Sequence, residues 1–199
     1  MSPQLICLAL FNASYLLAGA LVAWWQGSDE FVFYSVILLL LIAFVALVHR
    51  RVGLHLASLW LLSIWGAVHM AGGLWPIGEE RVLYDLWLLP DLLRYDHLVH
   101  AYGFGTTTWV CWQVLRRHLV DDGPRLGPVV MAVAAGMGFG AANELVEFVA
   151  TISLPETNVG GYENTGWDLV ANAVGTMLVG LAILLVGRRG EREDIVDGR

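Results

Sequence analysis

The chain has 199 residues, of which 57% are hydrophobic and only 15% are charged, and its mean hydropathy is +0.64. A soluble domain of this size has no use for so much apolar surface, and the short alternating segments of a membrane β-barrel are missing from the sequence. The net charge of −7 and the lack of a basic patch exclude nucleic acid as a partner. We therefore expect an all-α, polytopic membrane helix bundle that forms one integral membrane domain over residues 1–199.

Apolar runs close to the roughly 20 residues that cross a bilayer predict about six transmembrane helices. Their expected ranges are 4–25, 31–48, 54–75, 97–115, 128–150 and 167–187, followed by a flexible cytoplasmic tail at 188–199. Ala132, Gly136 and Gly140 repeat at four residues, a spacing that lets helices approach closely, and similar pairs on the fourth and sixth spans predict a tight core of the last three spans. The first two spans carry almost nothing polar, and we expect Asn12 and Ser14 to make helix–helix hydrogen bonds.

The arginines between these runs predict the orientation of the chain. Nine of the 11 basic residues follow the second, fourth and sixth spans, whereas the opposite side has only Arg81 and Arg94. Cytoplasmic loops carry the excess of basic residues. We therefore expect a multi-pass protein of the plasma (inner) membrane, with both termini in the cytoplasm and the connections 76–96 and 151–166 facing outward.

The two outward connections differ in composition. Residues 76–96 mix Leu, Trp, Tyr and acids, a pattern that predicts a short helix lying in the membrane interface and broken at Pro90. Asp85 and Asp91 are expected to be solvated loop acids. Residues 151–166 are rich in Gly and Asn, and this stretch is either a plain outer loop or a lid that folds back over a site.

Polar residues on four different spans fall at the same expected depth, near the outer ends. They are His69 on the third span, Asp96 and His100 on the fourth, Glu144 and Glu147 on the fifth, and Asp168 and Asn172 on the sixth. Residues four apart share one face of a helix, so the pairs on the fourth and sixth spans each point in one direction. An ionisable residue costs roughly 2.5–3.5 kcal/mol at the bilayer centre and less near the interface. Such a group of carboxylates and histidines therefore needs a compensating partner.

The donor types indicate what that partner is. Carboxylates combined with imidazoles and an amide suit Zn, Mn or Fe, whereas an all-oxygen site would suit Mg or Ca. We expect all seven residues to be able to hold one divalent metal ion, and His69, Asp96, His100, Glu144 and Asp168 to take part in catalysis. The other way to balance the four acids is that some of them are protonated. Without a metal, the same groups could relay protons or bind an ion. A nucleophilic triad is not expected, because no serine or cysteine nucleophile accompanies the histidines.

Four sequence segments carry a family resemblance: HMAGG at 69–73, RYDHLVHAYGFG at 94–105, NELVEF at 143–148 and GGYENTGWDLVANAVG at 160–175. They resemble the YjdF-like family of prokaryotic inner-membrane proteins and, more distantly, VanZ-like proteins, which share the order Asp…His, Glu, Asp…Asn…Gly on successive helices. The likeness covers about residues 65–180. It implies the membrane architecture rather than an activity.

Within this resemblance, the matching positions are His69, Asp96, His100, Glu144, Glu147, Trp167 and Asp168. The chain departs from the family pattern in its last segment. Gly161 and Asn164 stand where the family tends to have acids, and Gly166 stands where it has Gln. If those acids are ligands in the family, this chain has lost them.

These observations lead to one function and two rivals. The leading interpretation is a metal-dependent membrane enzyme that acts on membrane lipid or on a lipid-linked head group, because the polar residues lie at head-group depth. The first rival is a small transporter or an ion or proton pathway, which would continue the polar residues toward the cytoplasmic side. The second is a non-catalytic structural or binding protein whose cluster is a hydrogen-bonded staple. Fold resemblance does not decide among them.

Overall fold

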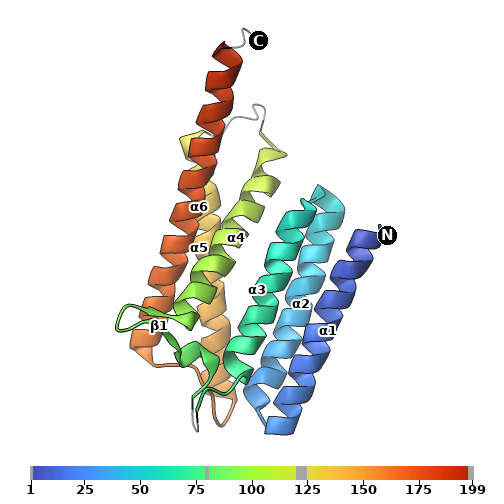
Figure 1. Cartoon of the computed structure of the whole chain (residues 1–199), viewed down its shortest axis with the longest axis vertical. Coiled ribbons are helices and arrows are strands. Elements are labelled where there is room, and N and C mark those ends of the chain that lie inside the picture. Colours follow the sequence, from blue (N-terminus) through green and yellow to red (C-terminus); the bar gives the residue numbers. More distant parts are fainter. Residues whose placement is uncertain (1, 79–80, 120–124, 197–199) are drawn as a thin grey trace.

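The computed structural model describes residues 2–78, 81–119 and 125–196 and confirms the all-α class (Figure 1). Six α-helices run side by side through the described part of the chain. They are α1 (Pro3–Gln26), α2 (Asp29–Val52), α3 (Leu56–Leu74), α4 (Tyr95–Arg116), α5 (Leu126–Ser153) and α6 (Tyr162–Val196). α6 therefore begins before the expected start at 167 and continues past the expected end at 187.

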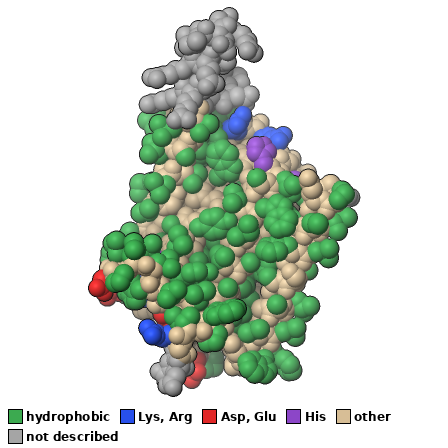
Figure 2. Space-filling view, viewed as in Figure 1, with side chains coloured by type: hydrophobic (Ala, Val, Ile, Leu, Met, Phe, Trp, Pro, Cys, Tyr) green, Lys and Arg blue, Asp and Glu red, His purple; other side chains and the backbone are tan. Residues whose placement is uncertain are grey.

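Five of these helices are long and apolar enough to cross a membrane: α1, α2, α3, α5 and the Tyr162–Val186 part of α6. The expected fourth span, α4, is not among them, although its 22 residues would reach about 33 Å. The reason lies in its packing. α4 contacts α3, α5 and α6, so it needs less apolar surface of its own than a helix that faces lipid. Figure 2 shows hydrophobic side chains spread over the visible face of the bundle.

Local signals account for the sharp turn between the first two helices. Gly27 ends α1 with a φ of 69°, a left-handed conformation that glycine adopts without a steric penalty. Ser28 then caps α2, because its hydroxyl oxygen accepts a hydrogen bond from the Phe31 N–H at 3.3 Å. A turn of this kind makes α1 and α2 antiparallel neighbours.

The connection between α3 and α4 differs from the predicted interfacial helix. It contains a single 3₁₀ turn at Leu83–Asp85 and then a two-stranded antiparallel hairpin, β1 (Trp87–Leu89) and β2 (Leu93–Arg94). Asp91 in the turn of this hairpin has a φ of 56°, which Asp tolerates better than most residues. Pro90 therefore sits in a hairpin turn rather than at a helix break, and the prediction of a helix was wrong.

The start of α1 and the end of α6 lie at the same end of the bundle, whereas the hairpin and the α5–α6 connection lie at the opposite end (Figure 1). We call this second end the hairpin end. It contains the connections that the arginine pattern places outside. The α5–α6 connection is shorter than expected, because α5 reaches Ser153 and α6 begins at Tyr162, so residues 154–161 form the loop and the rest of 151–166 is helical.

The expected tight core of the last three helices is confirmed. A Cβ on Gly175 of α6 would overlap the backbone carbonyl of Ala101 on α4, and a Cβ on Gly105 would lie 3.1 Å from the carbonyl oxygen of Gly175. On α5, Gly136 faces Thr108 of α4, and Gly140 faces the side chain of Asn172. Small residues thus let three backbones meet with little side-chain volume between them.

Of the two polar residues on α1 that were expected to bond a neighbouring helix, Asn12 does so and Ser14 does not. The amide of Asn12 donates to the hydroxyl oxygen of Ser63 on α3 at 2.8 Å, as expected for a helix–helix hydrogen bond. Ser14 instead donates to the Phe11 carbonyl of its own helix at 2.8 Å. Ser14 is therefore satisfied locally and does not join α1 to a neighbour.

We predict that Gly175→Ala destabilises the protein by about 1–3 kcal/mol, because the new methyl group meets backbone that cannot move aside. The matched control is Gly138→Ala on α5, where a Cβ would have nothing within 4 Å. That change should leave stability equal or slightly raised, because Ala is the better helix former. Unfolding of both variants in detergent measures the difference. Equal midpoints would contradict the close approach of α4 and α6.

Candidate metal centre

The predicted site residues lie near the hairpin end, on the last turns of α3 and α5 and on the first turns of α4 and α6. The antiparallel order of these helices explains this. α3 and α5 run toward the hairpin end and α4 and α6 start there, so residues distant in sequence reach one depth (Figure 1).

His100 is the centre of the cluster. Its Nε2 lies 3.5 Å from Asp96 Oδ1, and its Nδ1 lies 3.6 Å from Glu144 Oε1 and 3.2 Å from Asn172 Oδ1. The side chain of His100 is only 5% exposed. One imidazole therefore meets polar groups from α4, α5 and α6 in a poorly solvated place.

Two overlapping groups within the described residues offer atoms close enough to share one ion. Asp96, His100 and Asp168 form the first, and His100, Glu144 and Glu147 form the second. In each group the candidate ligand atoms lie within 4.8 Å of one another. We call the union of these two groups the carboxylate cluster. Oxygen and imidazole donors at this spacing suit a borderline divalent ion such as Zn, Mn or Fe.

Several buried polar atoms of the cluster have no hydrogen-bond partner among the residues that the structure describes. They are both carboxylate oxygens of Glu144, Oδ1 of Asp168 and Nδ2 of Asn172. The Asp168 and Asn172 side chains are fully buried, and that of Glu144 is 8% exposed. Buried polar groups are nearly always paired, and an unpaired charged group is especially costly. A cation bound among the Glu144 and Asp168 oxygens would remove their penalty, whereas the Asn172 amide beside the cluster is a donor and needs an acceptor.

The other carboxylate oxygens are held in place by amides. Asn143 on α5 donates to Glu147 Oε1 at 2.7 Å, and Asn164 on α6 donates to Asp168 Oδ2 at 2.6 Å. Both amides lie four residues from their acceptor on the same helix, a spacing that orients side chains toward each other. Asn164 stands where the resembling family tends to have an acid. In this chain it positions a carboxylate and adds no charge.

No described arginine forms an ion pair with the carboxylate cluster. Arg94, the nearest basic residue in sequence, instead stacks over the Trp87 ring with its guanidinium carbon 4.7 Å from the ring centroid. His97 also points away from the cluster and packs against Trp167, with ring centroids 6.1 Å apart. Arg94 and His97 act on Asp96 through space. Among the described residues, however, neither forms an ion pair with Glu144, Glu147 or Asp168, which favours a bound cation as the compensating charge.

His69 lies beside the carboxylate cluster and does not belong to either group. Its Nδ1 is 2.6 Å from the Tyr84 hydroxyl oxygen, and the same hydroxyl lies 2.9 Å from the His69 carbonyl oxygen. Both contacts are satisfied when Nδ1–H donates to the hydroxyl and the hydroxyl donates to the carbonyl, which leaves Nε2 unprotonated. Burial raises the pKa of Tyr84 well above its usual value, with the nearby Asp96 charge adding to the effect, so its hydroxyl keeps the proton that this arrangement requires.

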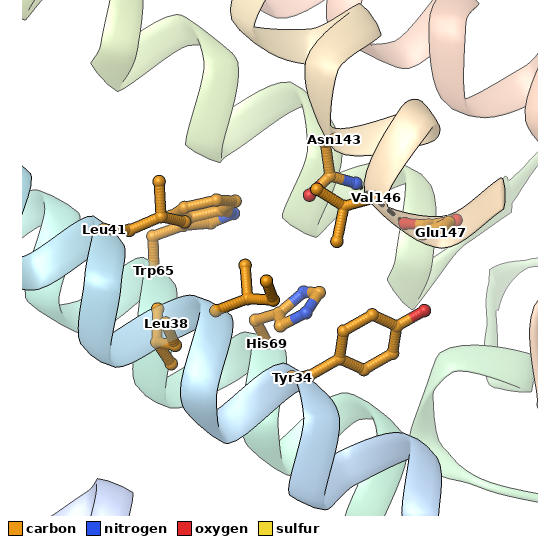
Figure 3. Close-up of a pocket in the computed structure, with 9 residues that line it drawn as sticks. Tyr34, Leu38, Leu41, Trp65, His69, Asn143, Val146 and Glu147 are labelled. Atoms are coloured by element: carbon orange, nitrogen blue, oxygen red, sulfur yellow. Dashed lines mark hydrogen bonds between the residues drawn. The ribbon is translucent and has the colours of Figure 1, made fainter. Parts of the chain in front are cut away.

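His69 also lines a small cavity between α2, α3 and α5 (Figure 3). The cavity has a volume of about 20 Å³ and is also lined by Tyr34, Trp65, Asn143 and Glu147. One water molecule needs roughly 10–15 Å³. The cavity therefore has room for a water between His69 and Glu147, and it is too small for a lipid head group.

The sequence prediction missed several residues of this site. Tyr84 comes from the connection between α3 and α4, Tyr34 and Trp65 line the cavity, and Asn143 and Asn164 hold carboxylates. Asn143 lies four residues before Glu147, and Asn164 lies four residues before Asp168, so helical spacing alone could have predicted both contacts. Tyr34 and Tyr84 carry no such signal, because their positions depend on how α2 and the connection pack.

The chain matches the protein family described as "Predicted membrane protein (DUF2238)" over residues 7–189. It belongs to this family. The finding agrees with the YjdF-like resemblance, since DUF2238 is the YjdF family, whereas the VanZ-like resemblance stays a prediction. Neither a curated protein nor a solved structure matches the chain. The family assignment supports a multi-pass membrane protein and leaves its chemistry to be argued from the site.

We predict that Tyr84→Phe lowers the free energy of unfolding by about 1–3 kcal/mol, because it leaves the buried His69 Nδ1 without a partner. Tyr162→Phe is the matched control, since Tyr162 is 96% exposed, and it should have no measurable effect. Thermal unfolding in detergent measures both. In addition, ¹⁵N chemical shifts of the His69 ring should show loss of the single tautomer in Tyr84→Phe alone. An unchanged ring spectrum would contradict the role of Tyr84.

Proposed function

We propose that this protein is a metal-dependent enzyme of the inner membrane that acts on a lipid or lipid-linked head group from the outer side. The observation that carries the proposal is the gathering of four acids around His100, in which both oxygens of Glu144 and Oδ1 of Asp168 are buried without a well-aligned hydrogen bond from the described residues. A divalent cation is the simple partner for such a set, since it would offset the repulsion among four acids.

Asp96, His100, Glu144 and Asp168 would hold the ion, with Glu147 completing the set on the cavity side. A bound metal of this kind makes water more acidic or polarises a phosphoryl oxygen. The protein residues supply the rest. His69 has a free Nε2 lone pair on the wall of a cavity that fits one water, so it is placed to accept a proton from that water. Tyr84 fixes the tautomer that makes this possible.

The proposed substrate class follows from depth and surroundings. The carboxylate cluster lies within about three turns of the helix ends at the hairpin end, and exposed aromatic side chains occur at the same end: Trp24 (78%), Trp25 (82%), Trp75 (65%) and Trp167 (53%). Tryptophans concentrate at the membrane–water interface. A site at that level meets phosphate and sugar head groups rather than acyl chains.

The metal proposal is tested by elemental analysis of the detergent-purified protein, first for the wild type and then for Asp168→Asn. We expect about one equivalent of Zn, Mn or Fe in the wild type and a large loss in the variant, because Asn keeps the shape but removes a charge. Asp91→Asn, in the exposed turn of the hairpin, is the control and should keep its metal. Thermal unfolding with and without chelator completes the test.

The outcomes separate the proposal from a hydrogen-bonded staple. If chelator lowers the wild-type midpoint and barely affects Asp168→Asn, the cluster is a cation site. If chelator does not change the wild-type midpoint and the midpoint of Asp168→Asn is well below that of the wild type, the cluster is a structural hydrogen-bond network. Such a network loses roughly 1–3 kcal/mol of stability for each buried group left unpaired. Hydrolysis of lipid-linked phosphates by the metal-loaded protein, and its loss in His69→Gln, then tests the enzymatic part.

The orientation belongs to the same proposal, because an outward site requires both termini in the cytoplasm. The nine-to-two division of arginines supports it. We predict that a C-terminal reporter that is active only in the cytoplasm gives a signal, and that one placed in the hairpin does not. A C-terminal reporter active only on the outer side would overturn the orientation and would put the carboxylate cluster on the cytoplasmic face.

A further inference from the structure

An open groove at the hairpin end lies between the α1–α2 turn and the α5–α6 connection. Residues 26–30 line one side and Pro155–Asn158 line the other, and the groove has a volume of about 690 Å³. This is far larger than the cavity beside His69. It is lined by the acids Asp29, Glu30 and Glu156, and none of these was among the predicted site residues.

Glu30 differs from the other two acids of the groove because it is buried. Only 4% of its surface is exposed, and its Oε2 accepts a hydrogen bond from the backbone N–H of Asn158 at 2.8 Å. In the described part of the chain, no arginine or histidine forms an ion pair with it. Glu30 therefore lies at the bottom of the groove, and the described groups that approach its carboxylate are Asn158 and the Tyr34 hydroxyl.

Tyr34 continues the same face of α2 toward the carboxylate cluster. It lies four residues after Glu30, which is one helical turn, and it lines the small cavity together with His69 and Glu147 (Figure 3). Tyr34 is 7% exposed, and its hydroxyl lies close to the Glu30 carboxylate on one side and within electrostatic reach of Glu147 on the other.

We propose that the groove is the entry site for the divalent cation, and that Glu30 and then Tyr34 pass the ion to Glu147 and the carboxylate cluster. This inference rests on the proposed metal site and names its access route. The Glu30 carboxylate at the groove floor comes first, the buried Tyr34 hydroxyl lies one turn deeper, and the Glu147 carboxylate lines the same small cavity as Tyr34. Hard divalent cations take oxygen ligands of this kind.

Glu30 also has a structural role, because its hydrogen bond ties the α5–α6 connection to the start of α2. The test must therefore remove the negative charge of Glu30 and keep its hydrogen bond with the Asn158 N–H. Glu30→Gln does this, since the amide oxygen of Gln can still accept from the Asn158 N–H. Glu156→Gln is the matched control, because Glu156 lines the same groove but is exposed. Tyr34→Phe tests the second step of the route.

The experiment mixes Mn²⁺ with metal-free protein in detergent and follows tryptophan fluorescence by stopped flow, since Trp65 lines the cavity. We expect Glu30→Gln to slow association about tenfold, in the range known for electrostatic steering, with the bound Mn²⁺ at saturation unchanged by electron paramagnetic resonance. Tyr34→Phe should also be slower, and Glu156→Gln should match the wild type. Higher ionic strength should reduce the difference between Glu30→Gln and wild type.

Each other result overturns a defined part of the argument. An unchanged association rate in Glu30→Gln, in a wild-type background that binds Mn²⁺, contradicts the entry route and leaves the metal site standing. Loss of bound Mn²⁺ at saturation in Glu30→Gln makes Glu30 a ligand and contradicts its role in access alone. Equal slowing in Glu156→Gln shows a general charge effect rather than a route. A wild type that binds no Mn²⁺, Zn²⁺ or Fe²⁺ removes the proposed function and the route together.

Discussion

The close backbone contact between α4 and α6 is the constraint on which the site depends. Gly175 lies against the carbonyl of Ala101 with no room for a side chain. His100 directly precedes Ala101, and Asn172 lies one turn before Gly175, so the same contact brings their side chains to 3.2 Å. Gly140 of α5 then leaves space for the Asn172 side chain. Larger residues at these glycines would separate the helices and with them the groups that surround His100.

The carboxylate cluster differs in kind from the other buried polar contacts of the bundle. Where other buried side chains pair between helices, as Asn12 does with Ser63 and Gln113 with Ser58, both groups are neutral. Such pairs join helices at little electrostatic cost. The cluster instead gathers four acids around one imidazole and leaves several of their oxygens without partners in the described part of the chain. A structural staple would not need charges, whereas a cation site does.

The sequence predicted the helices and the depth of the site, but not the direction in which each side chain points. Hydropathy and run length predict the spans, because a bilayer requires apolar runs of about one length. Residues at the same depth on neighbouring spans are then expected to lie close together, as Asp96, His100, Glu144 and Asp168 do. His69 has the same depth, yet it faces a separate cavity, because depth along a helix does not determine rotation about its axis. The hairpin was mistaken for a helix since its Leu-rich, Trp-rich composition suits either structure at an interface.

Between the carboxylate cluster and the arginine-bearing end of the bundle, the buried polar side chains of α4 and α6 are neutral. Thr108 donates to the Phe104 carbonyl at 2.8 Å, Thr176 to the Ala173 carbonyl at 3.0 Å, and Gln113 to the Ser58 hydroxyl. Residues 129–140 of α5 and 174–186 of α6 contain no Asp, Glu, His, Lys or Arg. An ion or proton that crossed the membrane would need polar partners there. On the other side, Tyr34 and the buried acid Glu30 continue from the cluster toward the hairpin end. This one-sided arrangement suits a site that receives its ion and substrate from the same face, and it argues against a path through the protein.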